Sequence, residues 1–276
     1  MTSLTDWVGR SEERQDVLAS QPCRFMQATL SHEPSLKDGD AVPPLWHWLY
    51  FLEAKPLHLL GRDGHPARGE FLPPVSLPRR MWAGGRFEFH QPLILGAEAT
   101  KRSTIKSIME KDGRSGPLCF VTVVHEVFQN DALALHEEHD IVYREDPRPD
   151  APTPMPQAAP SHAAFSEPVQ PSEVMLFRYS ALTFNGHRIH YDGNYARQVE
   201  GYEGLVFHGP LTATLLVDLA MRQTGKTPRR FDFRGTAPLA GLAAFDIQGQ
   251  NRDAHEVALW AKRSDGALAM SATAVF

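Results

Sequence analysis

The sequence predicts an α+β fold built from two similar units, each a long helix with an antiparallel sheet curled around it. Three observations support this: two landmarks recur in the same order in both halves, several stretches alternate apolar and polar residues, and one long stretch has helical periodicity. With 276 residues, 42% hydrophobic and 22% charged, the composition is that of a globular chain large enough for two small domains.

The first landmark is RFEFHQPLILG at residues 86–96, which matches RFDFRGTAPLAG at residues 230–241. The second is ALALHEEHDIVYR at residues 132–144, which matches ALAMSATAVF at residues 267–276. Matched landmarks in the same order indicate a duplicated structural unit.

Alternation of Val and Phe with polar residues predicts strands at residues 119–129 (CFVTVVHEVFQ), 256–263 (EVALWAKR) and 268–276 (LAMSATAVF). Turn signals lie between such runs, at residues 111–113 (KDG) and 264–266 (SDG). Short turns of this kind join antiparallel strands into hairpins.

A helix is predicted at residues 208–225 (HGPLTATLLVDLAMRQTG). Leu211 and Leu215 fall on one helical face, and the surrounding residues are also apolar, so the helix should be buried. Pro210 suits the first turn of a helix and Gly225 suits its end.

In the first half, residues 43–54 (PPLWHWLYFLEA) begin with prolines and continue with apolar residues at helical spacing, which predicts the equivalent helix. An enclosed helix wrapped by such a sheet is the hotdog arrangement, and two fused copies form a double hotdog with one continuous sheet. Residues 146–171 are rich in Pro and Ala, which predicts an extended linker. We therefore expect one hotdog at residues 1–145 and a second hotdog at residues 172–276.

Charge and cysteine content restrict the function. A net charge of −5 and a pI near 6.2 argue against a nucleic-acid-binding surface. Cys23 and Cys119 are too few for a disulfide framework and have no metal-ligand spacing, which fits a reducing cytoplasm. The first residues carry charges and no apolar core of a secretory signal, and no apolar run approaches membrane-span length. We expect a cytoplasmic protein.

The stretch FNGHRIHYD, Phe184 to Asp192, crowds polar side chains into one turn. It follows an apolar run at residues 174–182 (VMLFRYSAL), interpreted as the first strand of the second half, and precedes a helix-like run at residues 194–202 (NYARQVEGY). A turn this rich in chemistry either is solvated or lines a site.

With the residues after it, this turn resembles the signature of the MaoC-like (R)-specific enoyl-CoA hydratases, G-D-x-N-P-[IL]-H-x-D followed by Ala, a Gly-aromatic pair and His-Gly. His190, Asp192, Ala196, Gly201-Tyr202 and His208-Gly209 stand in register. The chain, in segments such as PPLWHWLYF and GEFLPPVSLPRRMWAGG, also resembles a branch that holds mitochondrial-type 3-hydroxyacyl-thioester dehydratases and bacterial mesaconyl-CoA and itaconyl-CoA hydratases.

The resemblance implies a hydro-lyase that acts on a CoA thioester, with no metal and no redox cofactor. It also implies that residues 172–276 form the catalytic hotdog and residues 1–145 the substrate-binding one. It makes His190 the candidate for proton transfer and the Gly209 N–H, at the start of the buried helix, the donor to the enolate oxygen. The Asp expected five residues before the His is Asn185 here, and an amide cannot be a general base, although it could hold the water. Asp192 either orients His190 or caps the next helix, and His208 either bonds backbone or lines the pocket.

The substrate is expected to be a short dicarboxylyl thioester, itaconyl-CoA or mesaconyl-CoA, which would give a citramalyl-CoA-type product. Arg80, Met81 and Trp82 resemble a pocket-lining segment, and Arg80 and Arg188 are candidates to meet the free carboxylate. The bulky aromatic residues in the predicted first helix favour a short acyl group, although aromatic side chains can equally be core.

Three alternatives stay open at this point. The enzyme could be a dehydratase of fatty 3-hydroxyacyl thioesters. It could be a thioesterase, which would need a carboxylate on the central helix, where Asp218 is the only acid. It could also be a non-catalytic acyl-CoA-binding protein. In each case the partner is a small-molecule acyl-CoA, with no nucleic acid and no membrane, and we expect a homodimer.

Overall fold

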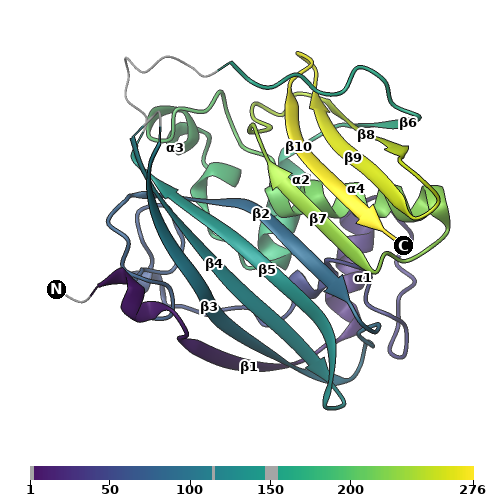
Figure 1. Ribbon diagram of the computed structural model, residues 1–276, viewed down its shortest axis with the longest axis horizontal. Coiled ribbons are helices and arrows are strands. Elements are labelled where there is room, and N and C mark those ends of the chain that lie inside the picture. Colours follow the sequence, from purple (N-terminus) through teal and green to yellow (C-terminus); the bar gives the residue numbers. More distant parts are fainter. Residues whose placement is uncertain (1–2, 114–115, 147–154) are drawn as a thin grey trace.

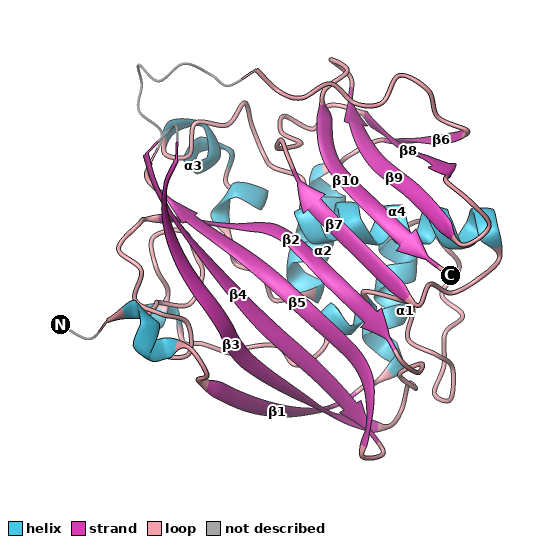
Figure 2. Ribbon diagram, viewed as in Figure 1, coloured by secondary structure: helices cyan, strands magenta, loops and turns pink. Residues whose placement is uncertain are grey.

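One continuous antiparallel sheet organises the molecule. The computed structural model describes residues 3–113, 116–146 and 155–276. Within them a ten-stranded sheet has the order β1-β3-β4-β5-β2-β7-β10-β9-β8-β6. In Figure 1 the sheet lies toward the viewer and α1, α2 and α4 lie behind it, and Figure 2 shows the same separation of strands and helices.

The strands are β1 (Ser11–Val17), β2 (Arg79–Phe89), β3 (Glu98–Gly113), β4 (Gly116–Gln129), β5 (Ala132–Arg144), β6 (Phe165–Val169), β7 (Arg230–Gly235), β8 (Phe245–Asn251), β9 (Glu256–Arg263) and β10 (Leu268–Val275). The α-helices are α1 (Ser20–Thr29), α2 (Glu173–Leu182), α3 (Gly193–Gln198) and α4 (Gly209–Thr224). Short 3₁₀ turns lie at η1 (Leu4–Trp7), η2 (Trp46–Leu49), η3 (Leu57–Leu59) and η4 (Arg188–His190).

The two halves have the same topology. The first half runs β1, α1, β2, β3, β4, β5, and the second runs β6, α2, α3, α4, β7, β8, β9, β10, so the strands correspond one to one while the second half has more helices. Counted outward from the centre of the sheet, the orders β2-β5-β4-β3-β1 and β7-β10-β9-β8-β6 are equivalent. This confirms the predicted double hotdog, and both pairs of sequence landmarks fall on equivalent strands.

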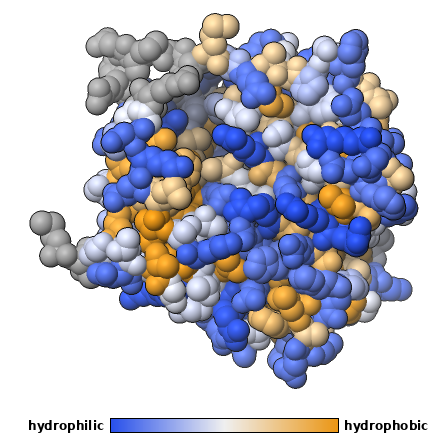
Figure 3. All heavy atoms as spheres, in the orientation of Figure 1, coloured by the Kyte–Doolittle hydropathy of each residue, from blue (hydrophilic) through white to orange (hydrophobic). Residues whose placement is uncertain are grey.

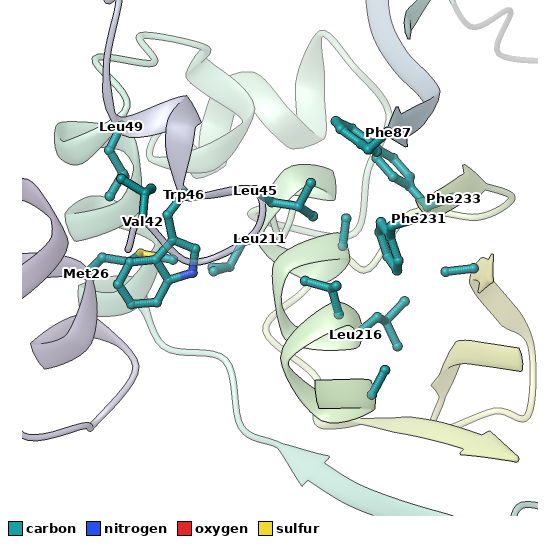
Figure 4. Close-up of a cluster of buried hydrophobic side chains, with 14 of the residues drawn as sticks. Met26, Val42, Leu45, Trp46, Leu49, Phe87, Leu211, Leu216, Phe231 and Phe233 are labelled. Carbon is teal, nitrogen blue, oxygen red and sulfur yellow. The ribbon is translucent and has the colours of Figure 1, made fainter. Parts of the chain in front are cut away.

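The halves join where the repeated RFEF and RFDF landmarks pair with each other. In the β2–β7 pair, Phe87 lies directly opposite Phe231, and both are fully buried. The ring of Phe233 stacks on that of Phe87 with centroids 6.0 Å apart. Figure 4 shows these three rings on one side of α4. A duplicated apolar strand therefore forms the centre of the core.

The outer face of the sheet is polar. At the same junction Arg86 forms ion pairs with Glu138 and Asp140 of the neighbouring β5. Figure 3 shows mostly hydrophilic side chains on this side of the molecule, with apolar patches between them. This alternation of buried and solvated side chains is what the period of two in the strands predicts.

The long helix of the second half forms as predicted. Pro210 occupies its first turn, and Gly225, with φ of 69°, ends it in the left-handed region that glycine favours. Leu211, Leu216 and Leu219 are fully buried, and the helix packs against β8, β9 and β10. Its first residue, Gly209, therefore has a fixed position relative to the sheet.

The predicted helix at residues 43–54 is wrong. Only η2 forms there, because Leu45 has a left-handed φ of 68° and interrupts any helix that starts at the prolines. The apolar side chains are nevertheless buried: Leu45, Trp46 and Leu49 pack in the same core as α4. Trp46 and Leu49 lie on the side of α4 away from the phenylalanines (Figure 4). The apolar residues of this segment are therefore buried as their spacing predicts, but they lie in an irregular segment rather than in a helix.

Residues 174–182 form a helix rather than the expected strand. They belong to α2, whose N-cap Ser172 accepts a hydrogen bond from the N–H of Met175 (3.1 Å). A serine three residues before the first apolar turn is a helix-start signal. Ten residues of mixed apolar character gave no clear period of two.

Part of the segment expected to be a linker belongs to the sheet. Residues 165–169 form β6, which pairs with β8 as the outer strand of the second half. The second structural repeat therefore begins at Phe165 rather than at residue 172. Residues 147–154 of the expected linker lie outside the described residues.

The hairpin signals are in place. Residues 264–266 connect β9 to β10, as predicted. β3 ends at Gly113 and β4 begins at Gly116, so the other turn includes residues outside the described part. No helix among the described residues combines the length and hydrophobicity that a bilayer crossing requires.

We predict that Phe87→Ala lowers the free energy of unfolding by about 3–5 kcal/mol, the usual range for truncating a fully buried aromatic residue. Urea denaturation followed by circular dichroism measures it. Phe25→Ala, at a residue that is 54% exposed, is the matched control and should cost less than about 1 kcal/mol. Equal losses for the two variants would contradict the proposed role of the β2–β7 junction.

Candidate active site

A cavity of about 1260 Å³ opens between the two halves. The second half contributes Asn185, Gly186, His187, His190 and Gly209 to its lining. The first half contributes His65, Arg80, Met81, Trp82, Lys101, His125, Glu137 and His139. The sequence-predicted residues therefore converge on one space, with exceptions described below.

The polar turn is shaped by its own backbone contacts. After α2, Phe184 adopts a left-handed φ of 48° and reverses the chain. The Oδ1 of Asn185 accepts a hydrogen bond from the N–H of His187 (3.0 Å), a local turn that Asn favours. η4 then carries His190 into the interior, where its side chain is 7% exposed.

The hydrogen bond of His190 fixes its tautomer. Its Nδ1 lies 2.7 Å from the carbonyl oxygen of Val206. A carbonyl can only accept, so Nδ1 carries the proton and the neutral ring leaves a lone pair on Nε2. Val206 is itself held by a hydrogen bond from its N–H to the oxygen of Ile189 (2.9 Å), next to the histidine. The loop before α4 thus orients the imidazole.

His208 lies behind His190 rather than in the cavity. The two rings stack with centroids 3.6 Å apart, and His208 is fully buried. Its Nε2 is 2.9 Å from the Oγ of Ser180 on α2. This corrects the expectation that His208 contacts substrate: its ring supports the His190 ring and links it to α2.

Gly209 begins α4 and faces open space. The N–H groups of a first helical turn have no partner within the helix, and the helix dipole makes that end favourable for negative charge. A Cβ added at Gly209 would meet nothing within 4 Å. Gly209 lines the cavity, so its backbone lies beside the space where an oxyanion would form.

Asp192 and Arg188 lie outside the cavity lining. The Oδ1 of Asp192 accepts a hydrogen bond from the N–H of Tyr195 (2.9 Å) as the N-cap of α3, and its Oδ2 pairs with Arg188 (2.8 Å). Arg188 also stacks on the ring of Tyr195. This corrects two expectations, because Asp192 does not orient His190 and Arg188 is not placed to bind substrate.

Arg80, Met81 and Trp82 line the cavity from the start of β2. The preceding Arg79 is buried against Glu200 (2.6 Å), which fastens this strand to the loop before α4. No carboxylate lies within 4.0 Å of the Arg80 guanidinium among the ion pairs of the described residues. The Trp82 ring rests on that of His139, with centroids 3.9 Å apart.

The sequence reasoning missed a pair of residues from the first half, Asp63 and His65. The Nδ1 of His65 lies 2.9 Å from the Oδ2 of Asp63. The His65 ring is 4.3 Å from that of His187, which in turn is 5.4 Å from that of His190. The tripeptide Asp63-Gly64-His65 indicates a turn with two polar side chains. Its position in the sequence does not predict that this turn lies near His190.

Burial keeps these imidazoles neutral. Loss of solvation is the largest cause that lowers the pKa of His190 and of His65 to about 4 each. It also lowers the pKa of His187 to about 2 and that of His208 well below its usual range. The carbonyl of Val206 acts in the opposite direction on His190, and Asp63 does so on His65. At neutral pH each ring keeps a free lone pair.

Two groups of side chains have ligand types that bind metal ions. Asp63, His65 and His187 form one, and His125, Glu137 and His139 form the other, with ligand atoms within 4.8 Å of one another. In both, the carboxylate already forms a hydrogen bond with a histidine, Asp63 with His65 and Glu137 with His47 (2.9 Å each). Each carboxylate therefore already has a histidine as hydrogen-bond partner.

Comparison with known proteins places this site in a family. The profile of the family described as Hydroxyacyl-thioester dehydratase type 2 matches residues 45–241. Over 270 residues, 97% of this chain and 95% of the relative, the sequence is 47% identical to a protein of Chloroflexus aurantiacus named Mesaconyl-C(4)-CoA hydratase. It is 29% identical over 255 residues to the mitochondrial Hydroxyacyl-thioester dehydratase type 2 of Schizosaccharomyces pombe, covering 81% of this chain and 84% of that protein.

The chain belongs to the hydroxyacyl-thioester dehydratase type 2 family. Solved structures agree at the level of fold. A MaoC-like dehydratase from Phytophthora capsici superimposes with a TM-score of 0.72 over 100% of this chain and 98% of that one, at 12% identity. HtdX of Mycobacterium tuberculosis gives 0.67 over 96% and 99%, at 15% identity. The protein is thus an enzyme of the MaoC-type hydratase and dehydratase class.

Membership in this family leaves the thioesterase alternative without support from the site. Burial raises the pKa of Asp218 to about 7, and its side chain is absent from the described lining of the cavity. A carboxylate on the central helix is therefore not placed to act on a thioester near Gly209. The site offers imidazoles and a backbone amide instead.

We predict that the enzyme loses stability as the pH falls from 6.5 to 5.5. Buried histidines with lowered pKa values bind fewer protons folded than unfolded, where the pKa is near 6.5, so protonation favours unfolding in this window. Each such histidine contributes up to about 1.4 kcal/mol per pH unit. Urea titrations at pH 7.5, 6.5 and 5.5 measure this. Asp63 and Glu137 have lowered pKa values and matter only below about pH 4.5, so an unchanged free energy at pH 5.5 would refute the neutral imidazoles.

Proposed function

We propose that this enzyme adds water to the double bond of mesaconyl-C4-CoA, a short dicarboxylyl thioester, and forms a citramalyl-CoA-type product. The observation that carries the proposal is Arg80, an arginine without a carboxylate partner among the described residues, in the cavity that also holds His190 and Gly209. The 47% identical relative named Mesaconyl-C(4)-CoA hydratase supports it. Itaconyl-CoA, the second substrate considered from the sequence, would give the same type of product.

The position of Arg80 suits this substrate. In a mesaconyl-C4 thioester the free carboxylate is attached to the β-carbon, the atom that water attacks. A cation that binds it must therefore lie beside the reacting carbons rather than at the end of a long tunnel. Arg80 lies close enough to His65 and His187 to lower their pKa values by charge repulsion. A guanidinium can hold such a carboxylate through two parallel hydrogen bonds.

His190 and Gly209 supply the chemistry at the thioester end. Hydration moves the electron pair of the double bond to the thioester oxygen, which the Gly209 N–H can hold at the start of α4. Nε2 of His190 exchanges a proton with the α-carbon: it removes that proton in dehydration and delivers it in hydration. The depressed pKa of His190, about 4, keeps Nε2 available to accept a proton at neutral pH.

A second candidate is dehydration of fatty 3-hydroxyacyl thioesters, which the family description and the 29% identical relative favour. The reaction is the same step in reverse, so the site supports both directions. The two candidates differ in what meets the acyl tail. Arg80 and Lys101 bring two cations into a lining that is otherwise mostly apolar, and a guanidinium there favours a substrate that ends in a carboxylate.

Hydration is measured as loss of enoyl-thioester absorbance with mesaconyl-C4-CoA and crotonyl-CoA, and by chromatography of the hydrated product with itaconyl-CoA, whose double bond is not conjugated to the thioester. We expect kcat/KM for mesaconyl-C4-CoA to exceed that for crotonyl-CoA by at least about 100-fold, since a buried carboxylate–guanidinium pair is worth several kcal/mol to binding. Faster turnover of crotonyl-CoA or of longer enoyl-CoA thioesters would support the dehydratase candidate instead.

The role of Arg80 has its own control. Arg80→Met should lower kcat/KM for mesaconyl-C4-CoA by about 100-fold or more while it changes that for crotonyl-CoA by less than about fivefold. Arg252→Met removes a charge that lies outside the cavity lining and pairs with Glu256, and it serves as the matched control. Equal effects of Arg80→Met on both substrates would show that Arg80 does not bind the carboxylate.

We predict that His190→Ala lowers kcat by about two to four orders of magnitude, the usual range for a lost acid–base group. In the wild type, kcat/KM should stay level as the pH falls from 8 to about 5.5 and decline toward the His190 pKa of about 4, because the protonated ring cannot accept a proton. His58→Ala, at an exposed histidine, should leave both unchanged. An acid limb centred near pH 6.5 would contradict the buried, neutral His190.

A further inference from the structure

Because position 185 is an amide, the residue that removes a proton from the attacking water has still to be identified. Hydration needs a group that takes a proton from water as the oxygen attacks. The Asn185 amide has no basic lone pair, and its Oδ1 already accepts the His187 N–H at 3.0 Å. The base has to come from another residue of the cavity lining.

His65 has the required form. Its Nδ1 lies 2.9 Å from the Oδ2 of Asp63, and since the carboxylate accepts, Nδ1 carries the proton. The lone pair is then on Nε2, which has no hydrogen-bond partner among the described residues. The ring lines the cavity, whereas Asp63 lies behind it. A carboxylate that holds one imidazole nitrogen and leaves the other free is the usual arrangement of a general base.

Backbone contacts fix this pair against the catalytic turn. The N–H of Arg188 donates to the oxygen of Asp63 (2.9 Å), and its guanidinium donates to the oxygen of Arg62 (3.2 Å). Gly64, with φ of 87°, faces Gly186 so closely that a Cβ on Gly64 would lie 2.0 Å from the Gly186 oxygen. Only glycine permits this approach. The first half therefore places His65 beside the second half's turn with little freedom.

The order of groups along the cavity wall matches the order of atoms in the substrate. The rings of His190, His187 and His65 follow one another in successive contacts. At the other side of His190, His208 stacks behind its ring, and Gly209 follows His208 as the first residue of α4. Arg80 lines the cavity from β2 of the first half, the half that also provides His65. With the thioester oxygen on Gly209 and the carboxylate on Arg80, the α-carbon faces His190 and the β-carbon faces His65.

We propose that His65, oriented by Asp63, is the base that removes a proton from the attacking water in place of the carboxylate missing at position 185. The inference rests on the proposed hydration of an enoyl thioester. His65 is the catalytic residue in this assignment, and Asp63 is a positioning residue that acts through it. The dyad also restores a negative charge to the acid–base machinery, since Asp63 stands in for the charge that Asn185 lacks.

The proton balance closes with all rings neutral at the start and the end. The water oxygen bonds to the β-carbon, its proton goes to Nε2 of His65, and the electron pair of the double bond moves to the thioester oxygen. The transient imidazolium is stabilised by the adjacent Asp63 carboxylate. The proton then crosses the intervening His187 to Nε2 of His190, which delivers it to the α-carbon as the enolate collapses. The overall change is addition of one water molecule, with no oxidant or cofactor.

The same residues could instead hold a divalent cation, since Asp63, His65 and His187 bring ligand atoms within 4.8 Å of one another. The hydrogen bond between Asp63 and His65 and the nearby charge of Arg80 both oppose this. An experiment with EDTA and Zn²⁺ separates the two interpretations.

The test measures kcat for His65→Ala, His65→Gln and Asp63→Asn on whichever enoyl-CoA the wild type hydrates fastest. We expect both His65 variants to lose about two to three orders of magnitude in kcat with KM within about fivefold, and Asp63→Asn to lose about tenfold or more. Adding Asn185→Asp to His65→Ala should recover at least about tenfold, because a carboxylate returns to position 185. A purely structural role for His65 would not be relieved in this way.

His58→Ala, in the same segment but exposed, is the control and should match the wild type. Thermal unfolding identifies any variant that does not fold, and His65→Gln and Asp63→Asn then decide. The inference is overturned if kcat of the folded His65 variants stays within about threefold of the wild type, if Asn185→Asp brings no recovery, or if EDTA abolishes wild-type activity and Zn²⁺ restores it. Wild-type preference for crotonyl-CoA would overturn the proposed substrate and still leave His65 testable on that thioester.

Discussion

The pairing of β2 with β7 is the contact on which the site depends. It joins two sheets into one and places the start of β2, with Arg80, opposite the loop that leads into α4. The buried Arg79–Glu200 ion pair ties the same strand to that loop. Because the cavity lies between the halves, any slip in this pairing would move the groups that bind the acyl tail relative to those that hold the thioester oxygen.

A row of imidazoles, buried at His187, His190 and His208 and half-buried at His65, gives the site its chemical character. Charged side chains would be expensive to bury there, whereas neutral histidines keep lone pairs that can accept protons. Single contacts, the Val206 carbonyl for His190 and the Asp63 carboxylate for His65, set which nitrogen is free. The cavity thus combines low polarity with proton-transfer groups, a combination that favours enolate chemistry over exchange with bulk water.

The fold was predictable because its signals are local and repeated. The phenylalanines at 87 and 231 sit in matching strings, and Pro210 and Gly225 mark the ends of α4. The first-half helix was mispredicted because burial at positions 45, 46 and 49 looks the same in a helix and in a folded loop. The left-handed backbone at Leu45 distinguishes the folded loop from a helix, and a leucine in the sequence does not predict that conformation.

The sequence predicted only those residues of the site that lie together in one contiguous motif. His190 and Gly209 lie in a contiguous motif, but the partners of Arg188 and Asp192 depend on distances that spacing does not give. Asp63 and His65 belong to the other half and reach the turn through the approach of Gly64 to Gly186, a tertiary contact. The spacing of residues along the sequence does not predict contacts between side chains that come from separate repeats.

The irregular segment around η2 has a consequence for stoichiometry. Two identical hotdog units would each have the N-terminus of a long helix, and the protein would then have two sites that could bind a thioester oxygen. Among the described residues the first half has no counterpart of α4, so only the second half provides that place. The two repeats therefore differ in function. The second repeat has the helix that holds the thioester oxygen, and the first repeat, which lacks this helix, lines the cavity around a single substrate molecule.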